Sequence, residues 1–206
     1  FGKKPIKSTY LIHKANFVAC HNPSYVNKYN MVQELVDGGT FLLNCAWDME
    51  GLEKHLPGQV KAFIANHNIK FYTIDGVKIG IETGMGPTRI NTILQSAFFK
   101  LTGIIPEDQA IDLMKAAAKA TYGRKGDDVV QKNWAAIDAG AKQIVEIQVP
   151  ESWKNAEDEG LHMTHATEGR QDVIDFVNNI QAKVNAQEGN SLPVSAFKDY
   201  VDGTTP

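Results

Sequence analysis

The stretch Thr40-Phe-Leu-Leu-Asn-Cys-Ala46 decides the fold, because it is a short, nearly continuous apolar run that is followed by polar residues. Two runs of the same kind lie on either side of it, Asn16–His21 (Asn-Phe-Val-Ala-Cys-His) and Ile69–Asp75 (Ile-Lys-Phe-Tyr-Thr-Ile-Asp). Apolar runs without alternation are typical of strands that are buried on both faces. The sequence therefore predicts three strands of a buried parallel sheet.

The segments between these strands carry signals for helices. Asn22 is a suitable cap with Pro23 at the first helical position, and the apolar period predicts a helix over residues 23–36. Asp48 can cap a second helical stretch, which Pro57 interrupts. An order of strand, helix, strand, helix, strand implies right-handed crossovers and an α/β fold.

Ligands of such sheets bind beyond the carboxyl ends of the strands. These ends are Cys20-His21-Asn22, Asn44-Cys45-Ala46 and Asp75-Gly76. The Gly-rich segment Gly84–Asn91 can reach the same edge of the sheet if it follows the third strand closely. We therefore expect any ligand site in this region.

The segment Glu82–Lys100 is a Gly-rich turn that leads into a strongly patterned helix, with Thr88 as the expected cap and Gly103 after its last turn. This helix has one apolar stripe, formed by Ile90, Ile93, Leu94, Ala97, Phe98 and Leu101. Arg89 and Asn91 then lie in the first turn, where unpaired N–H groups and the helix dipole favour an anion. The alternative is a helix that only packs on the sheet, with a solvated arginine.

A second group of cations lies at the start of the chain, where Lys3 and Lys4 stand next to a glycine and a proline. If Lys3 and Lys4 converge with Arg89 and Asn91, several positive or polar groups meet one polyphosphate. The alternative is an ordinary solvated loop.

The rest of the sequence is mainly helical. Pro106 begins one helix, and a longer apolar stripe extends from Val130 to Ile144. From Pro150 onward the chain becomes acidic and less periodic, with Trp153 as its main apolar residue. A last amphipathic helix carries Val173, Val177, Ile180 and Val184. We therefore divide the chain into an α/β domain over residues 1–149 and a smaller linker segment over residues 150–206.

Composition and motifs disfavour several classes of protein. The net charge of -3 gives no support for nucleic-acid binding. No apolar run approaches the roughly 20 residues of a membrane span. There is no G-x-G-x-x-G after a strand and no P-loop, so a stand-alone Rossmann nucleotide-binding domain is weakly supported.

Four other polar residues have a chemical and a structural interpretation. His162 and His165 could share a metal, although no further ligands accompany them. Cys20 could be a nucleophile at a strand end, but a buried structural cysteine is favoured. Asp75 could face a ribose hydroxyl, although a loop or helix cap is the favoured interpretation. The two cysteines of the chain could not by themselves hold an iron–sulfur cluster, which needs four ligands.

Several long runs of the sequence together resemble one known family. These runs are Phe1-Gly-Lys-Lys-Pro-Ile-Lys-Ser-Thr-Tyr-Leu11, Asn16–His21, Gly39-Thr-Phe-Leu-Leu-Asn44, Arg89-Ile-Asn-Thr-Ile93, Thr121-Tyr-Gly-Arg-Lys-Gly126, Lys132-Asn-Trp-Ala-Ala-Ile-Asp138 and Pro193-Val-Ser-Ala-Phe197. Most of the chain resembles the gamma domain of pyruvate:ferredoxin (flavodoxin) oxidoreductase. The last of these runs resembles the linker that leads into the Glu-Lys-Arg (EKR)-type domain.

The resemblance implies a Rossmann-like, three-layer fold, with a parallel sheet flanked by helices and a helical C-terminal part. It places the first βα unit before Phe1 and the Glu-Lys-Arg motif after Pro206. It implies an enzyme that converts pyruvate and coenzyme A to acetyl-CoA and CO2. Thiamine pyrophosphate, Mg2+ and [4Fe–4S] clusters are expected on other domains. The implied partners are those domains, a homodimer partner and ferredoxin or flavodoxin in the cytoplasm, with no nucleic acid and no membrane.

For this segment the resemblance implies that coenzyme A is bound by its phosphates. Lys3 and Lys4 would supply point charges, Arg89 a bidentate contact and Asn91 a hydrogen bond, and no residue would act as acid, base or nucleophile. The alternative is a structural or interaction module that packs neighbouring domains and the dimer partner. An exposed Trp153 and the acidic run 151–159 would suit that role.

Overall fold

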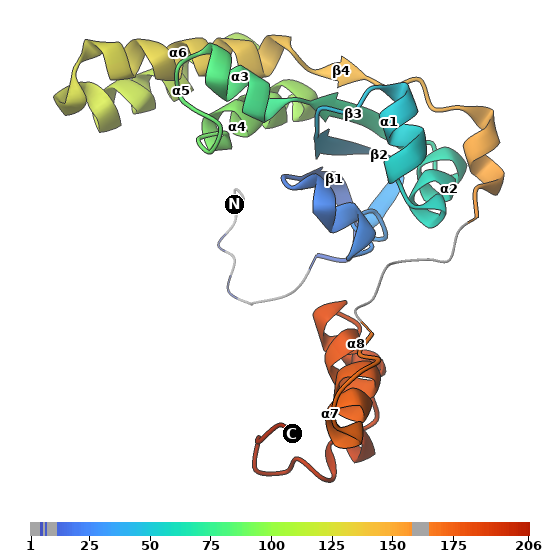
Figure 1. Ribbon diagram of the computed structural model, residues 1–206. Coiled ribbons are helices and arrows are strands. Elements are labelled where there is room, and N and C mark those ends of the chain that lie inside the picture. The colour runs from blue at the N-terminus through green and yellow to red at the C-terminus, as the bar shows by residue number, and fades with distance from the viewer. Residues whose placement is uncertain (1–4, 6, 8–11, 158–164) are drawn as a thin grey trace.

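The computed structural model describes residues 5, 7, 12–157 and 165–206. Its sheet has the order β1-β2-β3-β4, and the first three strands are parallel: β1 (Ala15–Cys20), β2 (Leu35–Asn44) and β3 (Lys70–Ile74). Figure 1 shows the sheet in the upper part of the molecule, with helices around it. The three strands expected from the apolar runs, and the α/β class, are confirmed.

The fourth strand was not expected from the sequence. β4 (Val145–Glu146) pairs antiparallel with β3, so the sheet is mixed rather than purely parallel. The preceding helix ends at Lys142, so the predicted helical stripe is wrong in its last residue, Ile144. The backbone turns into an extended path here, and Ile147 N donates to Phe71 O (2.9 Å), which satisfies the exposed edge of β3.

The predicted helix over residues 23–36 is also wrong. Only a 3-10 helix, η1 (Pro23–Asn27), follows the Asn22 cap, whose side chain accepts from Ser24 N. The chain is already extended at Leu35, which pairs with Ala15 of β1. Strand pairing therefore overrides the local helical period, and the register shifts between Ala15 and Phe17 to accommodate the extra residues of β2.

One face of the sheet is covered by α1 (Met49–His55), α2 (Gly58–Asn66) and the 3-10 helix η3 (Glu151–Asn155). As predicted, Asp48 caps α1, and α2 begins just after Pro57. The core on this face is fully buried and contains Phe41, Leu43, Phe71, Leu52, Val60, Ile64 and Trp153.

Trp153 corrects an expectation from the sequence, because it is 1% exposed and packs in this core. Its indole Nε1 donates to the Glu53 carboxylate of α1, and its ring is tilted against Phe71. The argument for an interaction module that used an exposed Trp153 is therefore wrong.

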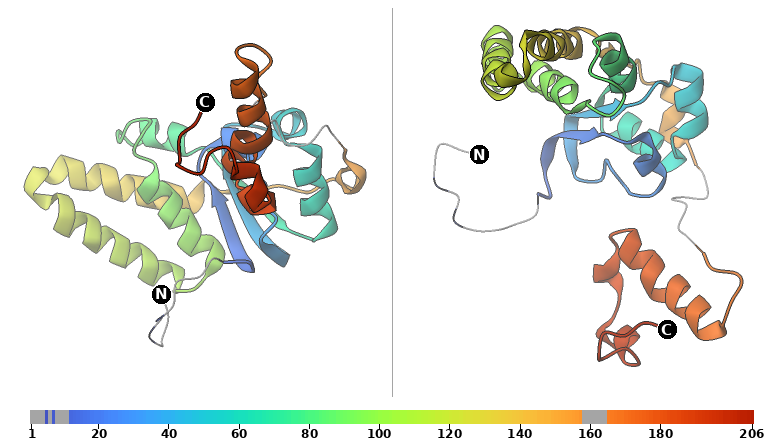
Figure 2. Two further views of the ribbon diagram at one scale, coloured as in Figure 1. Left: turned by 90° about the horizontal axis from the view of Figure 1, so that it is seen from below. Right: turned by 60° about the vertical axis from the view of Figure 1, so that its left-hand side comes forward.

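The other face is covered by α3 (Gly76–Glu82), α4 (Asn91–Thr102) and α6 (Asp127–Lys142), so helices flank both faces of the sheet (Figure 2). The core here contains Leu42, Ile74, Ile79, Ile93, Leu94, Ala97 and Ala136. α5 (Glu107–Tyr122) packs on α4 and α6 and extends with α6 away from the sheet.

The C-terminal part forms one continuous helix, as its apolar period predicts. It consists of α7 (Gln171–Phe176), a π-helical turn, η4 (Val177–Gln181), and α8 (Ala182–Asn185). Two 3-10 turns follow, η5 (Gly189–Ser191) and η6 (Val194–Phe197). Phe176 and Tyr200 contact edge to face (5.0 Å between centroids), so the tail folds back on this helix.

α4 and α6 approach each other unusually closely. Ser96 Oγ donates to Ile137 O (2.6 Å), and a Cβ at Gly140 would lie 2.4 Å from Ile93 O. The close packing thus requires the absence of a side chain at position 140.

We predict that Gly140→Ala lowers the free energy of unfolding by about 1–3 kcal/mol, because a backbone oxygen cannot move aside for the new methyl group. Gly123→Ala is the matched control, since Gly123 has helical dihedral angles and open space around its Cα. The control should change stability by less than about 1 kcal/mol, in the stabilising direction. Urea unfolding measures both variants, and equal effects would contradict the close approach.

Candidate functional site

The three strand ends of the parallel sheet are joined by one buried side chain. Asn44, 5% exposed at the end of β2, donates from Nδ2 to His21 O after β1 (2.8 Å). Its Oδ1 accepts from Gly76 N after β3 (2.9 Å). Both halves of the amide are therefore used, and the carboxyl edge of the sheet has a fixed geometry.

The loop that follows α3 returns to this edge, as the sequence predicted. Asp75 caps α3 by accepting from Lys78 N (2.9 Å), which confirms the structural interpretation of this carboxylate. An added Cβ at Gly76 would contact Ile90 Cβ at 3.4 Å, so the end of the loop lies against the end of β3. Gly86 N donates to Gly80 O (2.8 Å) and fixes the middle of the loop on α3.

The start of α4 differs from the expectation. The helix begins at Asn91, its N-cap is Ile90 rather than Thr88, and no side chain caps it. Arg89 therefore precedes the first turn instead of lying in it, whereas Asn91 is the first helical residue. At the other end, Gly103 is the left-handed C-cap (φ 59°), as predicted. The first-turn N–H groups of α4 lack a side-chain acceptor, which is the arrangement that binds anions.

The fold brings Arg89 and Asn91 together, because both line the same cavity of about 460 Å3. The other lining residues come from the loop, α4, the end of α5, the 3-10 turn η2 (Gly123–Lys125) and α6: Met85, Thr92, Tyr122, Lys125, Val129 and Asn133. The lining thus holds two cations, Arg89 and Lys125, and no carboxylate among the described residues. Such a cavity favours an anion electrostatically.

The cations of this cavity are available. Within the described part of the chain, Arg89 has no ion pair or hydrogen bond, and Lys125 Nζ lies 5.5 Å from the centre of the Tyr122 ring. Lys3 and Lys4, the other two expected site residues, lie outside the described residues. The sequence analysis missed Lys125, although the short break Arg124-Lys125-Gly126 between two helices was a signal for a cation at a turn.

A second, more apolar cavity of about 660 Å3 lies at the carboxyl edge itself. It is lined by Asn44, Trp47 and residues of α3, including Val77 and Ile81, which are 41% and 59% exposed. Lys78 in this lining is close to Glu82 (3.9 Å), so its charge is partly balanced. This cavity is therefore a weaker candidate for an anion.

The cysteines at the strand ends are structural. Cys20 and Cys45 are both buried and free, and the Cys20 Sγ–H donates to Asn22 O (3.1 Å). Burial raises the pKa of the Cys20 thiol to about 11, and burial also raises the pKa of Cys45. A thiol that stays protonated at neutral pH is a poor nucleophile, so the structural interpretation is confirmed.

Metal and membrane sites gain no support from the described residues. No three His, Cys, Asp or Glu side chains within residues 12–157 and 165–206 come together as a metal site. His162 of the expected histidine pair lies outside these ranges. No described helix combines the length and the apolar composition that crossing a bilayer requires.

These features define the chain as a Rossmann-like α/β domain with a cationic cavity among helices α4, α5 and α6, followed by a helical segment. The model of the pyruvate ferredoxin/flavodoxin oxidoreductase family matches residues 1–143. The chain therefore belongs to this family. A second family model, described as a domain of unknown function, matches residues 163–206.

Relatives cover the whole chain. It is 44% identical over all 206 residues to pyruvate:ferredoxin oxidoreductase of Moorella thermoacetica, and 44% identical to pyruvate-flavodoxin oxidoreductase of Enterobacter agglomerans. In both cases the chain spans 17% of the relative's length. The crystal structure of pyruvate oxidoreductase subunit PORC from Thermotoga maritima has the same fold (TM-score 0.52, 17% identity, 66% of this chain and 67% of that one).

We predict that Asn44→Ala lowers the free energy of unfolding by about 2 kcal/mol, because the buried Gly76 N–H loses its acceptor. Asn66→Ala is the matched control, since it removes one exposed hydrogen bond, to Lys154 O. The control should cost less than about 1 kcal/mol. Comparable losses in urea unfolding would show that Asn44 does not bridge the strand ends.

We also predict that the native protein reacts slowly with thiol reagents at pH 8, and that both thiols react at once in denaturant. The raised pKa of Cys20 also makes the free energy of unfolding depend on pH. Between pH 9 and 11 the unfolded chain has lost the Cys20 proton while the folded chain still holds it, so the protein becomes less stable as the pH rises. Cys20→Ala should flatten this part of the pH profile. Rapid labelling of the native protein at pH 8 would contradict the burial of both thiols.

Proposed function

We propose that this chain is the coenzyme A-binding segment of a multidomain pyruvate:ferredoxin or flavodoxin oxidoreductase, and that it holds the phosphates of coenzyme A. The observation that carries the proposal is the cavity at the start of α4, where Arg89, Lys125 and the uncapped helix amides converge without a carboxylate among the described lining residues. The names of the two oxidoreductases that are 44% identical support the choice of enzyme.

In this proposal each group has a distinct role. Arg89 makes a bidentate contact to a phosphate, because its planar guanidinium matches two phosphate oxygens. Lys125 supplies a second charge across the cavity, and Asn91 adds a hydrogen bond beside the helix amides. Lys3 and Lys4 supply further point charges. Several cations on one polyphosphate give strong, salt-dependent binding.

The segment performs no chemistry itself. The complete enzyme converts pyruvate and coenzyme A to acetyl-CoA and CO2, and passes the electrons to ferredoxin or flavodoxin. We place thiamine pyrophosphate and Mg2+ on its other domains. The residues here do not fit a [4Fe–4S] cluster, since it needs four thiolates and the chain has two cysteines, both buried. The partners in this proposal are the remaining domains and a second copy of the enzyme in the cytoplasm.

A second function, packing against neighbouring domains, is favoured by the apolar cavity at the carboxyl edge. Val77 and Ile81 on α3 are largely exposed beside Trp47, and the chain spans only 17% of the relatives' length. This role would use α3 and the strand ends, whereas the phosphate site uses the start of α4 with α5 and α6, so the two functions are compatible.

We predict that Arg89→Ala and Lys125→Ala each weaken coenzyme A binding roughly 10- to 100-fold, because each removes a charge-assisted contact. The double variant Lys4→Ala, Arg89→Ala should lose more. Isothermal titration with coenzyme A and dephospho-coenzyme A measures the change at two salt concentrations.

Lys100→Ala is the matched control, because it removes the same charge from the other end of α4, where Lys100 pairs with Glu107. Its affinity for coenzyme A should match that of the unaltered protein. Unchanged binding in Arg89→Ala, or an equal loss in the Lys100 control, would reject the phosphate assignment.

A further inference from the structure

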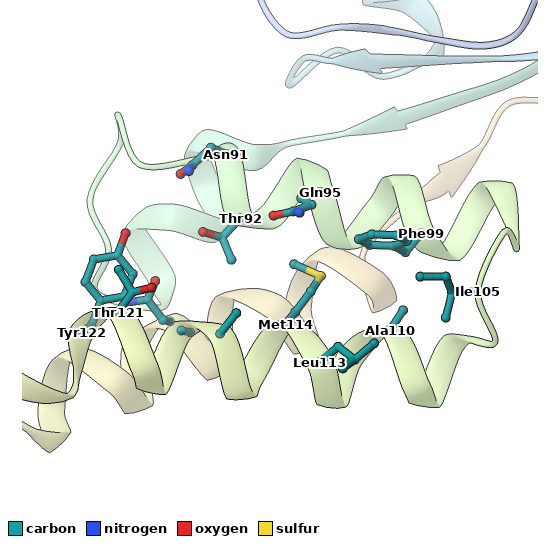
Figure 3. A pocket seen from close by; sticks show the side chains of 13 residues that line it. Asn91, Thr92, Gln95, Phe99, Ile105, Ala110, Leu113, Met114, Thr121 and Tyr122 are labelled. Carbon is teal, nitrogen blue, oxygen red and sulfur yellow. The ribbon is translucent and has the colours of Figure 1, made fainter. Parts of the chain in front are cut away.

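Two cavities at the carboxyl edge of the sheet join into one groove. The apolar cavity of about 660 Å3 described above adjoins another of about 820 Å3. The two have the following lining residues in common: Cys45, Ala46, Trp47, Asp75 and Lys78. We call the combined space the edge groove. Among the described residues it shares no lining with the cavity that Arg89 lines, or with the space between α4 and α5 into which Thr92 and Met114 are directed (Figure 3).

Large apolar side chains are exposed in both parts of the edge groove. Val77 and Ile81 of α3 line the first cavity. Met49 of α1 and Val145 of β4 line the second, and they are 39% and 55% exposed. Apolar side chains that are exposed together, with polar residues around them, mark a contact with another protein surface. The edge groove is therefore a candidate interface.

Trp47 lies between these two parts, since it lines both cavities. Its ring is stacked on His55 of α1, with 4.9 Å between the centroids and 24° between the planes. A Cβ at Gly51 would lie 3.0 Å from Trp47 Cβ, so the first turn of α1 also packs against this side chain. His55 thus fixes one face of the indole, and the opposite face can receive a group from a partner. Aromatic side chains that are already fixed contribute strongly to interfaces.

The polar groups of the edge groove are already used by the fold. Asn44 bridges the strand ends with both halves of its amide. Asp48 caps α1 by accepting from Gly51 N (2.9 Å), and Asp75 caps α3. A small ligand needs a few free polar groups that fix its orientation. The edge groove therefore suits a protein segment better than a small molecule.

The charges around the edge groove favour a cationic partner. Its lining has four carboxylates and two ammonium groups, which leaves a net charge of -2. These charged residues are Asp48, Asp75, Glu82, Glu146, Lys78 and Lys142. An arginine or lysine of a partner would be attracted by this charge and also by the face of the Trp47 ring.

We propose that the edge groove is the docking surface for another domain of the same polypeptide, which places an apolar segment along Val77 and Ile81 and a cation over Trp47. The inference rests on the second proposed function, packing against neighbouring domains, and it names the chemistry of the partner. The same polypeptide is the source because the chain spans only 17% of relatives that are 44% identical to it over all 206 residues. Most of such an enzyme lies in other domains.

The first test measures access to the edge groove in the complete enzyme. Ile81→Cys places a thiol in the groove. Ile104→Cys is the matched control, because Ile81 and Ile104 are 59% and 63% exposed in this chain. We expect the thiol of Ile81→Cys to react with a neutral maleimide about tenfold more slowly than that of the control, because a docked domain excludes the reagent. Peptide mass spectrometry resolves each thiol from the other cysteines, and equal rates would overturn the proposal.

The second test reverses one charge of the edge groove. Glu146→Lys, added to Ile81→Cys, should raise the labelling rate about tenfold, because two cations then face each other across the interface. Asp112→Lys is the matched control, since Asp112 is an exposed carboxylate on α5 and does not line the groove. It should leave the rate unchanged. An equal rate with and without Glu146→Lys would overturn the cationic partner.

The third test identifies the partner in the unaltered enzyme, so it does not depend on any substitution. Lys78 lines both cavities, and a lysine-specific crosslinker should join it to a residue outside this chain. Enzyme reassembled from isotopically heavy and light copies shows which polypeptide supplies that residue. Crosslinks within one isotopic form support our inference. Crosslinks of Lys78 that join heavy to light peptides show that a second copy occupies the groove, and they would overturn it, as would crosslinks to this chain alone.

The outcomes separate this inference from the proposed functions. If Ile81→Cys reacts slowly and Glu146→Lys changes nothing, the packing function stands and our cationic partner is wrong. If Ile81→Cys reacts as fast as Ile104→Cys, both the packing function and this inference are wrong. Arg89→Ala should leave the labelling of Ile81→Cys unchanged, so the phosphate assignment is decided independently by coenzyme A titration.

Discussion

The Asn44 amide is the interaction on which the rest of the structure depends. It links the backbone after β1 to the first residue of α3, so the three parallel strands end in one fixed arrangement. A Cβ at Gly76 would lie 2.9 Å from Asn44 Oδ1, so a larger residue after Asp75 would push the Asn44 amide away from this bond. Sheet, helix and loop are therefore coupled through a single side chain that is 5% exposed.

This constraint extends to the cavity through a series of close backbone contacts. α3 begins at Gly76, and the carbonyl oxygen of Gly80 in this helix accepts a hydrogen bond from Gly86 N of the loop. The two segments lie so close that a Cβ at Gly80 would be 2.4 Å from Gly86 O. The loop then places Ile90 against Gly76. Because the loop is fixed on α3 at Gly86 and again at Ile90, the backbone at Arg89 between these two contacts is held in place. A backbone that is already fixed loses less entropy when a ligand binds.

The parts of the fold that the sequence predicted correctly are those determined by local chemistry. The three apolar runs became strands, and Asp48 and Asp75 became caps, because burial and capping act over a few residues. The errors arose where distant contacts decide. Residues 23–36 have a helical period, yet Leu35 pairs with β1, and Trp153 is held in the core by α1. Neither partner can be recognised from local sequence.

In the candidate site too, the residues marked by local sequence were predicted, and those placed by distant contacts were not. Arg89 and Asn91 were found because a glycine-rich turn before a helix is a local signal, although the helix starts later than Thr88 predicts. Lys125 and Asn133 join them only because α4, α5 and α6 pack side by side, and α4 meets α6 at positions without bulk, such as Gly140. Arg89 and Asn91 could therefore be predicted from sequence, whereas the residues that α5 and α6 add to the lining could not, because they depend on how the helices pack.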